Sequence, residues 1–350
     1  MQELNSVNEL AVKTHGGLSQ RKTVNKIICQ GEPWGPIECS LQIDAIGKES
    51  LNPCLQPYKY KDHVQNPALG FVDDVITVSE SGFKTARMNL FMNAQFAMKK
   101  LRLGPKKCFS MHIGKKHEEY KNVQLYFDGW VVQSVNLFES GDVHWEDTLN
   151  NDMNETSHID KEKYLGQVIS SDSKNANNIE QLRNKGIGIQ NKIIDMLERM
   201  PGGPYHFEIA VILRNALLIS SILSNSEVWY GLTKIDIEQL EQIDEMWIRN
   251  LFDLSRNVSK DLLYLEVGLV PISFIIKSRR QMFLHHILQQ KKNSLVHKFF
   301  MAQMKSPTKN DWVSTALEDI EELDINLELE EIEEMSRERF KSIVKEKVEI

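Results

Sequence analysis

The segment at residues 66–81, NPALGFVDDVITVSES, places two adjacent aspartates, Asp73 and Asp74, inside a run that is otherwise apolar and rich in β-branched residues. Such residues favour extended backbone, so the segment predicts two short strands joined by a tight connection at the aspartates. Two neighbouring carboxylates repel each other, and each loses favourable solvation when it is buried. The pair must therefore lie beside water or beside a cation.

A cation is the more specific of these two interpretations. Mg²⁺ prefers oxygen ligands and keeps several of its waters when one or two carboxylates bind it. In nucleotidyl transfer, two such ions about 3.5–4 Å apart hold the attacking and the leaving oxygens. In the alternative interpretation, the two aspartates form an ordinary solvated turn without a chemical role. The dipeptide by itself does not decide between them.

Composition places the chain among soluble globular proteins. Its 350 residues suffice for two or three domains, and it is 41% hydrophobic and 26% charged. The net charge of −7 argues against a uniformly basic nucleic-acid binder. The charge is unevenly distributed, because residues 1–116 contain 16 Lys and Arg against 10 Asp and Glu, whereas residues 318–334 contain ten acids and no base. Only the N-terminal part is therefore expected to face a polyanion.

The cysteines and the apolar runs indicate an intracellular protein. The four cysteines form no CxxC pair and have no zinc-finger spacing with histidine, which favours free thiols in a reducing compartment. No apolar run reaches the roughly 20 residues of a membrane helix, and the first residues, MQELNSVNELAV, lack the features of a secretory signal. We expect a protein of the cytoplasm or the nucleus without membrane contact.

Helices are expected on both sides of the aspartate pair. The segment 35–51 has helical spacing of its apolar residues, and Pro36 suits a first helical turn. The segment 82–103 predicts an amphipathic helix. Its apolar face is expected to consist of Phe83, Ala86, Leu90, Ala94, Ala97 and Leu101.

Further along the chain, strands are expected before helices. The segments 106–114, 122–140 and 162–172 have strand character, with Asp128 and Gly129 as a hairpin turn. The pattern then becomes helical, with a break at PGGP in residues 201–204. The expected helices lie at 176–200, 205–231, 235–256, 259–264 and 272–303, and an acidic amphipathic stretch follows at 313–348. The expected fold class is α+β in the first half and all-helical in the second.

Four segments occur in an order that resembles a known family. They are QGEPWGPIECSLQID at 30–44, FVDD at 71–74, LRLGPKKCFSMHIGK at 101–115 and EKYLGQVISS at 162–171. Over roughly residues 10–170, this order resembles the palm of the reverse transcriptases of non-LTR retrotransposons. The helical segments NKGIGIQNKIIDML and LLYLEVGLVPISFIIKSRRQM resemble the region downstream of that palm.

The resemblance implies a domain organisation and an activity. Residues 1–120 would be a partial right-hand polymerase palm, an antiparallel sheet with helices, and residues 121–172 would complete the palm with the primer-grip strands. Residues 173–260 would form a helical, thumb-like region, and residues 261–350 a C-terminal helical region with an acidic end. The fingers would be absent. The implied activity is RNA-directed DNA polymerisation, with an RNA template, a DNA primer and deoxynucleoside triphosphates as partners.

The resemblance also assigns roles around the aspartate pair. Asp73 corresponds to the aspartate that binds the catalytic magnesium ions, and Asp74 is its partner, usually the less direct ligand. Phe71 takes the aromatic position of the motif, where tyrosine is more common.

Other residues would contact the substrates. Gln30 and Gly31 correspond to the pair that contacts the template and the incoming nucleotide. Lys107 corresponds to the basic-loop lysine that reaches the triphosphate, and Leu165 with Gly166 corresponds to the primer-grip turn. Each has a plainer alternative from the sequence alone: Lys107 in a solvated turn, Leu165 in an ordinary core and Gly166 in an ordinary turn.

One element of the family pattern has no counterpart here. A polymerase palm uses a third carboxylate on a strand ahead of the Gln-Gly segment, but the only acids before Gln30 are Glu3 and Glu9, neither on an expected strand. Phosphoryl transfer depends on positioning and charge stabilisation, so we expect this N-terminally truncated chain to be inactive alone. The alternative from another functional class is a non-catalytic nucleic-acid-binding or interaction protein that retains the palm and thumb.

Overall fold

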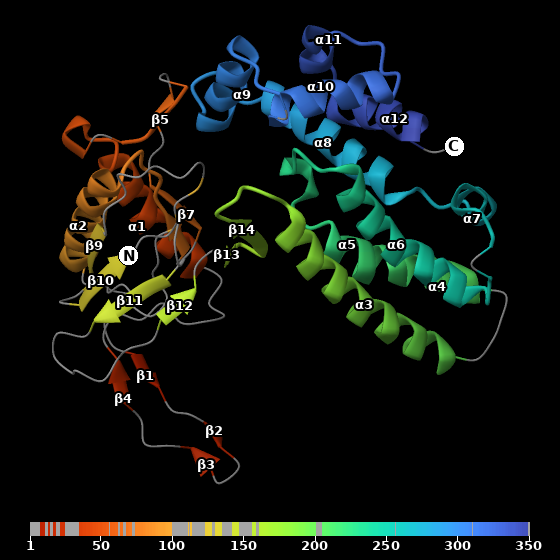
Figure 1. Cartoon of the computed structure of the whole chain (residues 1–350), viewed down its shortest axis with the longest axis horizontal. Coiled ribbons are helices and arrows are strands. Elements are labelled where there is room, and N and C mark those ends of the chain that lie inside the picture. Colours follow the sequence, from red (N-terminus) through yellow and green to blue (C-terminus); the bar gives the residue numbers. More distant parts are fainter. Residues whose placement is uncertain are drawn as a thin grey trace.

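Helices dominate the protein, and small antiparallel sheets accompany them in its N-terminal half (Figure 1). The computed structural model describes the following residues: 8–10, 13–14, 17–18, 22–24, 35–55, 57–61, 64–65, 68–71, 74–99, 111, 113, 123–127, 130–134, 142–146, 156–158, 161–200, 205–255, 257–309 and 311–348. Within these ranges, the expected change from mixed α and β structure to all-helical structure is confirmed. None of the helices in this described part is long and apolar enough to cross a bilayer.

The described strands all pair in antiparallel fashion. One sheet has four strands in the order β12-β11-β10-β9, and its strands are β9 (Val123–Phe127), β10 (Trp130–Ser134), β11 (Asp142–Glu146) and β12 (Thr156–His158). The other described sheets are pairs: β1 (Asn8–Leu10) with β4 (Lys22–Val24), β2 (Lys13–Thr14) with β3 (Gly17–Leu18), β5 (Lys59–Tyr60) with β6 (Val64–Gln65), β7 (Leu69–Phe71) with β8 (Asp74–Ile76), and β13 (Lys161–Tyr164) with β14 (Gln167–Ser170).

These pairings confirm the expected hairpins and modify the expected sheet. The strands β9 and β10 flank residues 128–129, and β7 and β8 flank residues 72–73, as the turn signals indicated. The resemblance implied one palm sheet, whereas β7 and β8 form a separate pair among the described strands. The mixed fold class is therefore confirmed at the level of helices and antiparallel strands, and the continuous palm sheet is not seen in this part.

Two helices build the core around the β7–β8 hairpin. They are α1 (Gly35–Glu49) and α2 (Gly82–Met98), and a short 3-10 turn, η1 (Pro53–Leu55), lies between them in the sequence. The buried residues of this cluster are Ile43, Ile46, Ala68, Met88, Met92 and Phe96. Both helices were expected at these positions, and both are confirmed.

The buried face of α2 differs from the expected one. Met88, Met92 and Phe96 are buried at a spacing of four residues, whereas Leu90 is 52% exposed and Ala94 is also exposed. The expected stripe was therefore wrong at Leu90 and Ala94, and the Phe83 side chain and Leu101 lie outside the described part. The two methionines have unbranched side chains that adapt to an irregular surface, and they share a buried cluster with Ile43 and Ile46 of α1.

The second half begins with a helical bundle. Its helices are α3 (Ala176–Glu198), α4 (His206–Leu213), the π-helical turn η3 (Arg214–Ile219), α5 (Ser220–Ile222), the 3-10 turn η4 (Ser226–Val228), α6 (Lys234–Leu251) and α7 (Lys260–Val267). One apolar cluster joins them, and its fully buried members include Ile193, Leu240 and Trp247. The expected helices at 176–200, 235–256 and 259–264 are confirmed to within a few residues.

The remaining helices form a second cluster around α8. They are α8 (Ile272–Leu288), α9 (Leu295–Lys305), α10 (Trp312–Glu322), α11 (Leu329–Glu334) and α12 (Arg337–Val348). The helix α8 belongs to both clusters, because Ile272 and Ile276 pack into the first and Leu284 and Ile287 into the second. In Figure 1 it runs between α5 and α6 on one side and α10 and α12 on the other.

The single helix expected at 272–303 is in fact two. The first ends at Leu288, and α9 begins after Ser294, whose hydroxyl accepts a hydrogen bond from the His297 amide at 3.3 Å. Serine at an N-cap satisfies a free amide of the first turn. The break coincides with six consecutive polar residues, QQKKNS at 289–294, so the sequence did contain a signal that the expectation of one helix overlooked.

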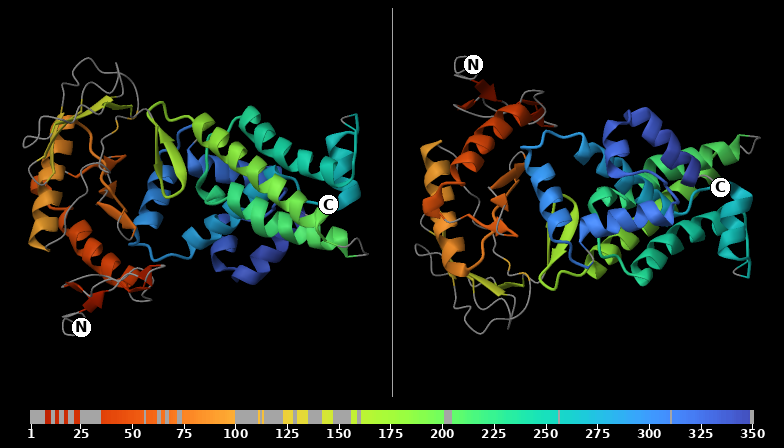
Figure 2. Two further views of the ribbon diagram at one scale, coloured as in Figure 1. Left: turned by 90° about the horizontal axis from the view of Figure 1, so that it is seen from below. Right: turned by 90° about the horizontal axis from the view of Figure 1, so that it is seen from above.

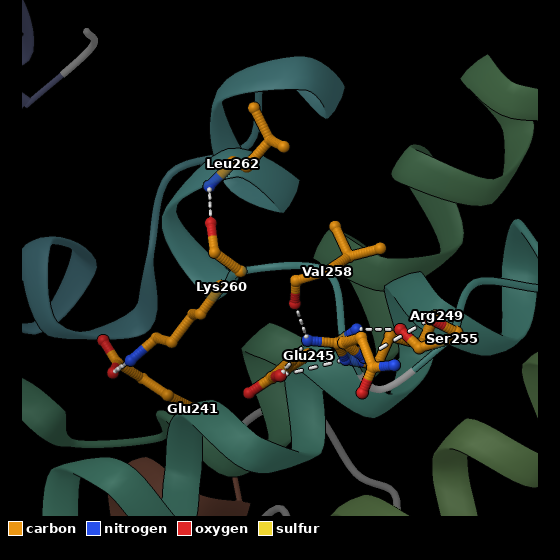
Figure 3. A network of polar contacts seen from close by, with 9 residues as sticks. Glu241, Glu245, Arg249, Ser255, Val258, Lys260 and Leu262 are labelled. Atoms are coloured by element: carbon orange, nitrogen blue, oxygen red, sulfur yellow. Dashed lines mark hydrogen bonds and ion pairs between the residues drawn. The ribbon is translucent and has the colours of Figure 1, made fainter.

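A polar network holds the connection between α6 and α7 (Figure 3). Arg249 bonds to the Glu245 carboxylate in the preceding turn, and its remaining donors reach the carbonyls of Ser255 at 2.5 Å and Val258 at 2.7 Å. Lys260 at the start of α7 pairs with Glu241. One arginine therefore supplies donors to a loop whose carbonyls would otherwise lack partners.

A buried ion pair joins three elements of the bundle and the connection after α7. Arg214 in η3 is 2% exposed and Asp244 in α6 is 0% exposed. The arginine Nε lies 2.6 Å from Asp244 Oδ1, and its Nη2 bonds to Oδ2 and to the Val270 carbonyl. The Tyr264 hydroxyl of α7 donates to Asp244 Oδ2 at 3.1 Å. Burial, and then the Asp244 charge, raises the pKa of Tyr264, so this phenol stays protonated as a donor.

Replacing Asp244 by alanine should strongly destabilise the bundle. The change leaves the buried Arg214 charge unpaired, which costs about 3–5 kcal/mol of unfolding free energy. The matched control is Asp195→Ala, because Asp195 pairs with Arg199 on the exposed surface of α3, where a pair contributes less than about 1 kcal/mol. Urea unfolding followed by circular dichroism measures both. Equal small losses would contradict the structural role of the buried pair.

The packing of α3 on α6 depends on a glycine. A Cβ added at Gly186 would lie 3.0 Å from Ile243 Cγ2 and 3.2 Å from Ile222 Cγ2. Both isoleucines are almost completely buried, so neither side chain has room to withdraw. A Cβ at Gly188, two residues later in the same helix, would meet nothing within 4 Å.

Alanine should therefore have opposite effects at these two glycines. At Gly188 it should stabilise the protein by about 0.5–1 kcal/mol, because glycine is unfavourable inside a helix. At Gly186 the same gain is outweighed by overpacking, which typically costs about 1–3 kcal/mol. Thermal and urea unfolding of the two variants provide the comparison. A stabilised Gly186→Ala variant would show that the α3–α6 contact is looser than described.

Candidate functional site

The β7–β8 hairpin presents its tip to solvent. Phe71 and Asp74 are direct partners in the register, and Val72 and Asp73 between them lie outside the described residues. Phe71 is 61% exposed, and Asp74 is exposed as well. The Asp74 carboxylate therefore keeps its water, and the burial cost that the sequence suggested does not arise at this residue.

Close contact with α1 fixes the position of this hairpin. A Cβ at Gly70 in β7 would lie 1.9 Å from Ile43 Cγ2, and a Cβ at Gly47 in α1 would lie 2.8 Å from the Ala68 carbonyl oxygen. Ser50 completes the contact, because its hydroxyl accepts from the Ala68 amide at 2.8 Å and donates to the Gly47 carbonyl at 2.6 Å. Sequence reasoning missed these residues, although a glycine within a strand is a known sign of close backbone approach.

The β13–β14 hairpin turns at Leu165 and Gly166. Both residues have positive φ, 46° and 85°, which is the conformation of a two-residue type I′ turn. Glycine adopts it freely, but a leucine in this region is uncommon. The Leu165 side chain is 40% exposed, so it does not belong to an ordinary core. The expected Leu-Gly turn is thus confirmed as a turn, and its role in binding a primer stays a prediction.

Amide side chains attach this hairpin to the helical bundle. Asn178 of α3 accepts from the Val168 amide at 3.1 Å and donates to Gln167 Oε1 at 2.7 Å. The Trp229 indole donates to the same Gln167 oxygen at 3.2 Å, and the Gln167 amide donates to the Ser224 carbonyl at 2.9 Å. The hairpin is therefore held by the bundle rather than by the four-stranded sheet.

The two hairpins lie close to each other. Tyr164, the residue before the Leu165–Gly166 turn, has a raised pKa because of burial and, second, because of the negative charge of Asp74. Charges in proteins act on each other over roughly 10 Å at physiological salt, and Asp74 lies within that range of this phenol. Figures 1 and 2 show β7 and the β13–β14 hairpin beside each other where the mixed half meets the helical half.

The two halves also meet at a second place, next to β5 and β6. The Tyr60 ring packs on Phe299 of α9 with a centroid distance of 5.1 Å. Lys61 donates to the Ser306 carbonyl and lies 3.7 Å from the Asp311 carboxylate. The mixed half therefore also contacts the helical half through Tyr60 of β5 and through Lys61, the residue after it.

The structure describes half of the site residues expected from the sequence. Phe71, Asp74, Leu165 and Gly166 are described, and they come from two hairpins that the fold brings together. Gln30, Gly31, Asp73 and Lys107 lie outside the described residues. Tyr164 joins the site as a residue that sequence reasoning did not select, although it directly precedes the Leu-Gly turn.

The described part of the chain contains no cluster of side chains that could enclose a metal ion. No group of three or more His, Cys, Asp or Glu within it has a geometry that would hold a metal. At the β7–β8 hairpin Asp74 is the carboxylate that is described. Mg²⁺ bound by one or two carboxylates retains most of its waters, so an exposed Asp74 next to Asp73 fits a hydrated ion but does not enclose one.

A shallow groove of about 550 Å³ lies between α3 and α6. Its lining residues are Ala176, Glu180, Arg183, Ile235, Glu238, Gln239 and Gln242. Because both acidic and basic side chains line this groove together with neutral ones, its charge favours neither an anionic nor a cationic ligand. None of the expected site residues lines this groove.

No protein-family model matches this chain, and no curated protein or solved structure matches it either. A functional assignment therefore depends on the ordered motifs and on the geometry of the two hairpins.

Removing the Asp74 charge should lower the pKa of Tyr164. In Asp74→Asn the phenolate loses an unfavourable neighbour, so the pKa should move toward the ordinary value of about 10 but remain above it, because burial is the larger cause. Carbon-13 NMR of labelled tyrosine, with Tyr164→Phe to identify the signal, measures the shift. Glu80→Gln is the control, since Glu80 pairs with Lys84 instead. An unchanged Tyr164 pKa in Asp74→Asn would mean that the hairpins are not close.

Proposed function

We propose that this chain carries the palm and thumb of an RNA-directed DNA polymerase of the non-LTR retrotransposon type. The observation that carries the proposal is the arrangement of the two hairpins, because the aspartate hairpin lies beside the Leu165–Gly166 turn where the two halves meet (Figures 1 and 2). The two motifs are far apart in the sequence, and a nucleotidyl-transfer site requires that carboxylates lie near the primer end.

The exposed apolar side chains at the two hairpins support this proposal. Phe71 is 61% exposed and Leu165 is 40% exposed. Aromatic side chains stack on bases and sugars of single strands and of primer ends, and an apolar turn can pack on the sugar of the last primer nucleotide. Exposed apolar side chains occur elsewhere on this protein too, so the support comes from the position of these two at the hairpin turns and not from their exposure alone.

In this proposal Asp73 and Asp74 hold Mg²⁺, which supplies charge stabilisation at the attacking and leaving oxygens when it is bound. The chain's own residues bind and orient the substrates. Gln30 and Gly31 contact the template and the incoming nucleotide, where an absent Cβ permits close approach, and Lys107 reaches the triphosphate.

Nucleotidyl transfer in a polymerase palm requires a third carboxylate in addition to Asp73 and Asp74. Before Gln30 the chain offers Glu3 and Glu9 as its acids. Contrary to expectation Glu9 does lie on a strand, β1, but among the described strands β1 pairs with β4 and not with the aspartate hairpin. We therefore expect this polypeptide to bind a primer–template hybrid and to extend it only when a longer polypeptide supplies an aspartate on an adjacent strand.

A second candidate is a nucleic-acid-binding or interaction protein that keeps these surfaces without catalysis. The organisation of the C-terminal helices favours it, because α8–α12 have a core of their own that includes Phe300, Ile332 and Phe340. Such a protein would bind the hybrid in the same place, and metal ions would not affect that binding.

Hybrid binding should depend on Leu165. Leu165→Asn keeps the turn, since asparagine tolerates left-handed backbone that costs other residues roughly 1–2 kcal/mol, so stability should stay equal or rise. Affinity for a primer–template hybrid should fall about fivefold, as the loss of roughly 1 kcal/mol of apolar contact implies. Fluorescence anisotropy with a labelled RNA–DNA hybrid measures it. Leu262→Asn is the matched control, because Leu262 in α7 is similarly exposed, at 46%, and lies far from the hairpins.

The metal dependence separates the two candidate functions. Binding that falls with salt, together with Mg²⁺-dependent extension by a longer polypeptide that Asp73→Asn abolishes, supports the polymerase. Binding that is insensitive to EDTA and to Asp73→Asn, without extension by the longer polypeptide, supports the non-catalytic protein. Absence of hybrid binding at low salt would overturn both.

A further inference from the structure

The segment 223–231 between α5 and α6 has few backbone partners of its own. Its internal hydrogen bonds run from Ser226 to Leu223, from Val228 to Asn225 and from Trp229 to Ser226. Asn225 adopts left-handed backbone with φ of 59°. Because carbonyl groups in folded proteins need hydrogen-bond donors, side chains from other elements determine the course of this segment.

One group of contacts comes from the β13–β14 side. Gln167 donates to the Ser224 carbonyl at 2.9 Å and accepts from the Trp229 indole at 3.2 Å. Asn225 donates to the Leu165 carbonyl at 3.5 Å. The backbone of the Leu165 turn is therefore bonded to this segment and follows its position.

A second group of contacts comes from the C-terminal helices. Arg279 of α8 donates to the Leu223 carbonyl and, at 3.3 Å, to the Ser226 hydroxyl. Arg280 donates from Nε to the Trp229 carbonyl at 3.1 Å. Trp312 of α10 donates from its indole to the Glu227 carbonyl at 2.8 Å. These donors reach the carbonyls of the same segment that β14 contacts.

The C-terminal donors are themselves held firmly. Arg280 pairs with Asp319 of α10, and the two side chains are only 4% and 6% exposed. The Trp312 ring packs edge-on against Phe283 of α8 with a centroid distance of 5.5 Å. The helices α8 and α10 thus form a fixed support from which these donors reach segment 223–231.

We infer that α8 and α10 position the β13–β14 hairpin through segment 223–231, with Arg279 and Trp312 as positioning residues for Tyr164 and the Leu165 turn. The geometry of the contacts carries this inference. It rests on the proposed function only where it adds that the positioned turn faces a primer–template hybrid. The region after the thumb-like bundle would then influence the site without touching its ligand.

Two substitutions test the inference in the full chain. Arg279→Gln removes the guanidinium donors, and Trp312→Phe keeps an aromatic ring against Phe283 while removing the indole donor. Amide hydrogen exchange over residues 161–170 should accelerate about fivefold in each variant, the factor that corresponds to a net hydrogen bond of roughly 1 kcal/mol. Exchange in α12 should stay unchanged, and the Tyr164 pKa should move toward that of a solvated phenol.

Lys277→Gln is the matched control. It removes a contact from the same helix, the Lys277–Glu322 pair between α8 and α10, but no contact with segment 223–231. Exchange at 161–170 and the Tyr164 pKa should stay as in the unchanged protein. Equal acceleration in this variant, or in α12 of the test variants, would indicate general loosening and overturn the inference.

A double variant separates positioning from independent structural effects. Gln167→Ala breaks the hairpin side of the same connection. If the connection is one path, adding Arg279→Gln to Gln167→Ala should accelerate exchange at 161–170 by much less than the product of the two single effects. Multiplicative effects would overturn the inference.

Hybrid binding distinguishes failure of this inference from failure of the proposed function. If the hybrid binds, Arg279→Gln and Trp312→Phe should weaken binding several-fold and Lys277→Gln should not. If the unchanged protein binds no hybrid, the proposed function is overturned, and the exchange data alone decide the positioning role. If the hybrid binds and exchange at 161–170 does not change in the two variants, the positioning role is overturned.

Discussion

Backbone carbonyls need hydrogen-bond donors, and this requirement connects the two halves of the protein at segment 223–231. The segment makes few bonds within itself, so its carbonyls take donors from β14 on one side and from α8 and α10 on the other. Apolar packing builds the two helical clusters, which α8 joins. The polar contacts of this segment, together with those of Asn178 in α3, relate the clusters to the hairpin at the candidate site.

Buried charge plays a comparable part inside the bundle. The Arg214–Asp244 pair removes two charges from water, and such a pair stabilises a fold only when every remaining donor and acceptor is used. Here the Tyr264 hydroxyl donates a further hydrogen bond to Asp244, and the Val270 carbonyl accepts one from Arg214. The π-helical turn that begins at Arg214 aims this side chain at α6, so an irregular backbone turn serves to complete a buried network.

The candidate site combines residues that no local pattern connects. Asp74 and Phe71 lie on a hairpin that packs closely against α1, because Gly70 and Gly47 have no side chain at the contact. Leu165 and Gly166 are presented by a hairpin that the bundle holds. Tyr164 lies where the two hairpins approach each other. Burial raises the pKa of its phenol, and the Asp74 charge raises it further. The proposed polymerase function depends on this approach and on the order of the motifs.

Local patterns in the sequence predicted the hairpins around 72–73 and 128–129 and most helix positions, because β-branched runs, turn residues and apolar periodicity act over a few neighbouring residues, whereas the turn at 165–166 was implied only by the family resemblance. The sequence by itself did not determine which face of α2 is buried or whether Asp74 is exposed. Those features depend on partners distant in the chain: Met88 and Met92 share a buried cluster with residues of α1, and the Asp74 charge acts on Tyr164. Only the tertiary structure decided them, because burial and charge proximity arise when separate segments meet in space.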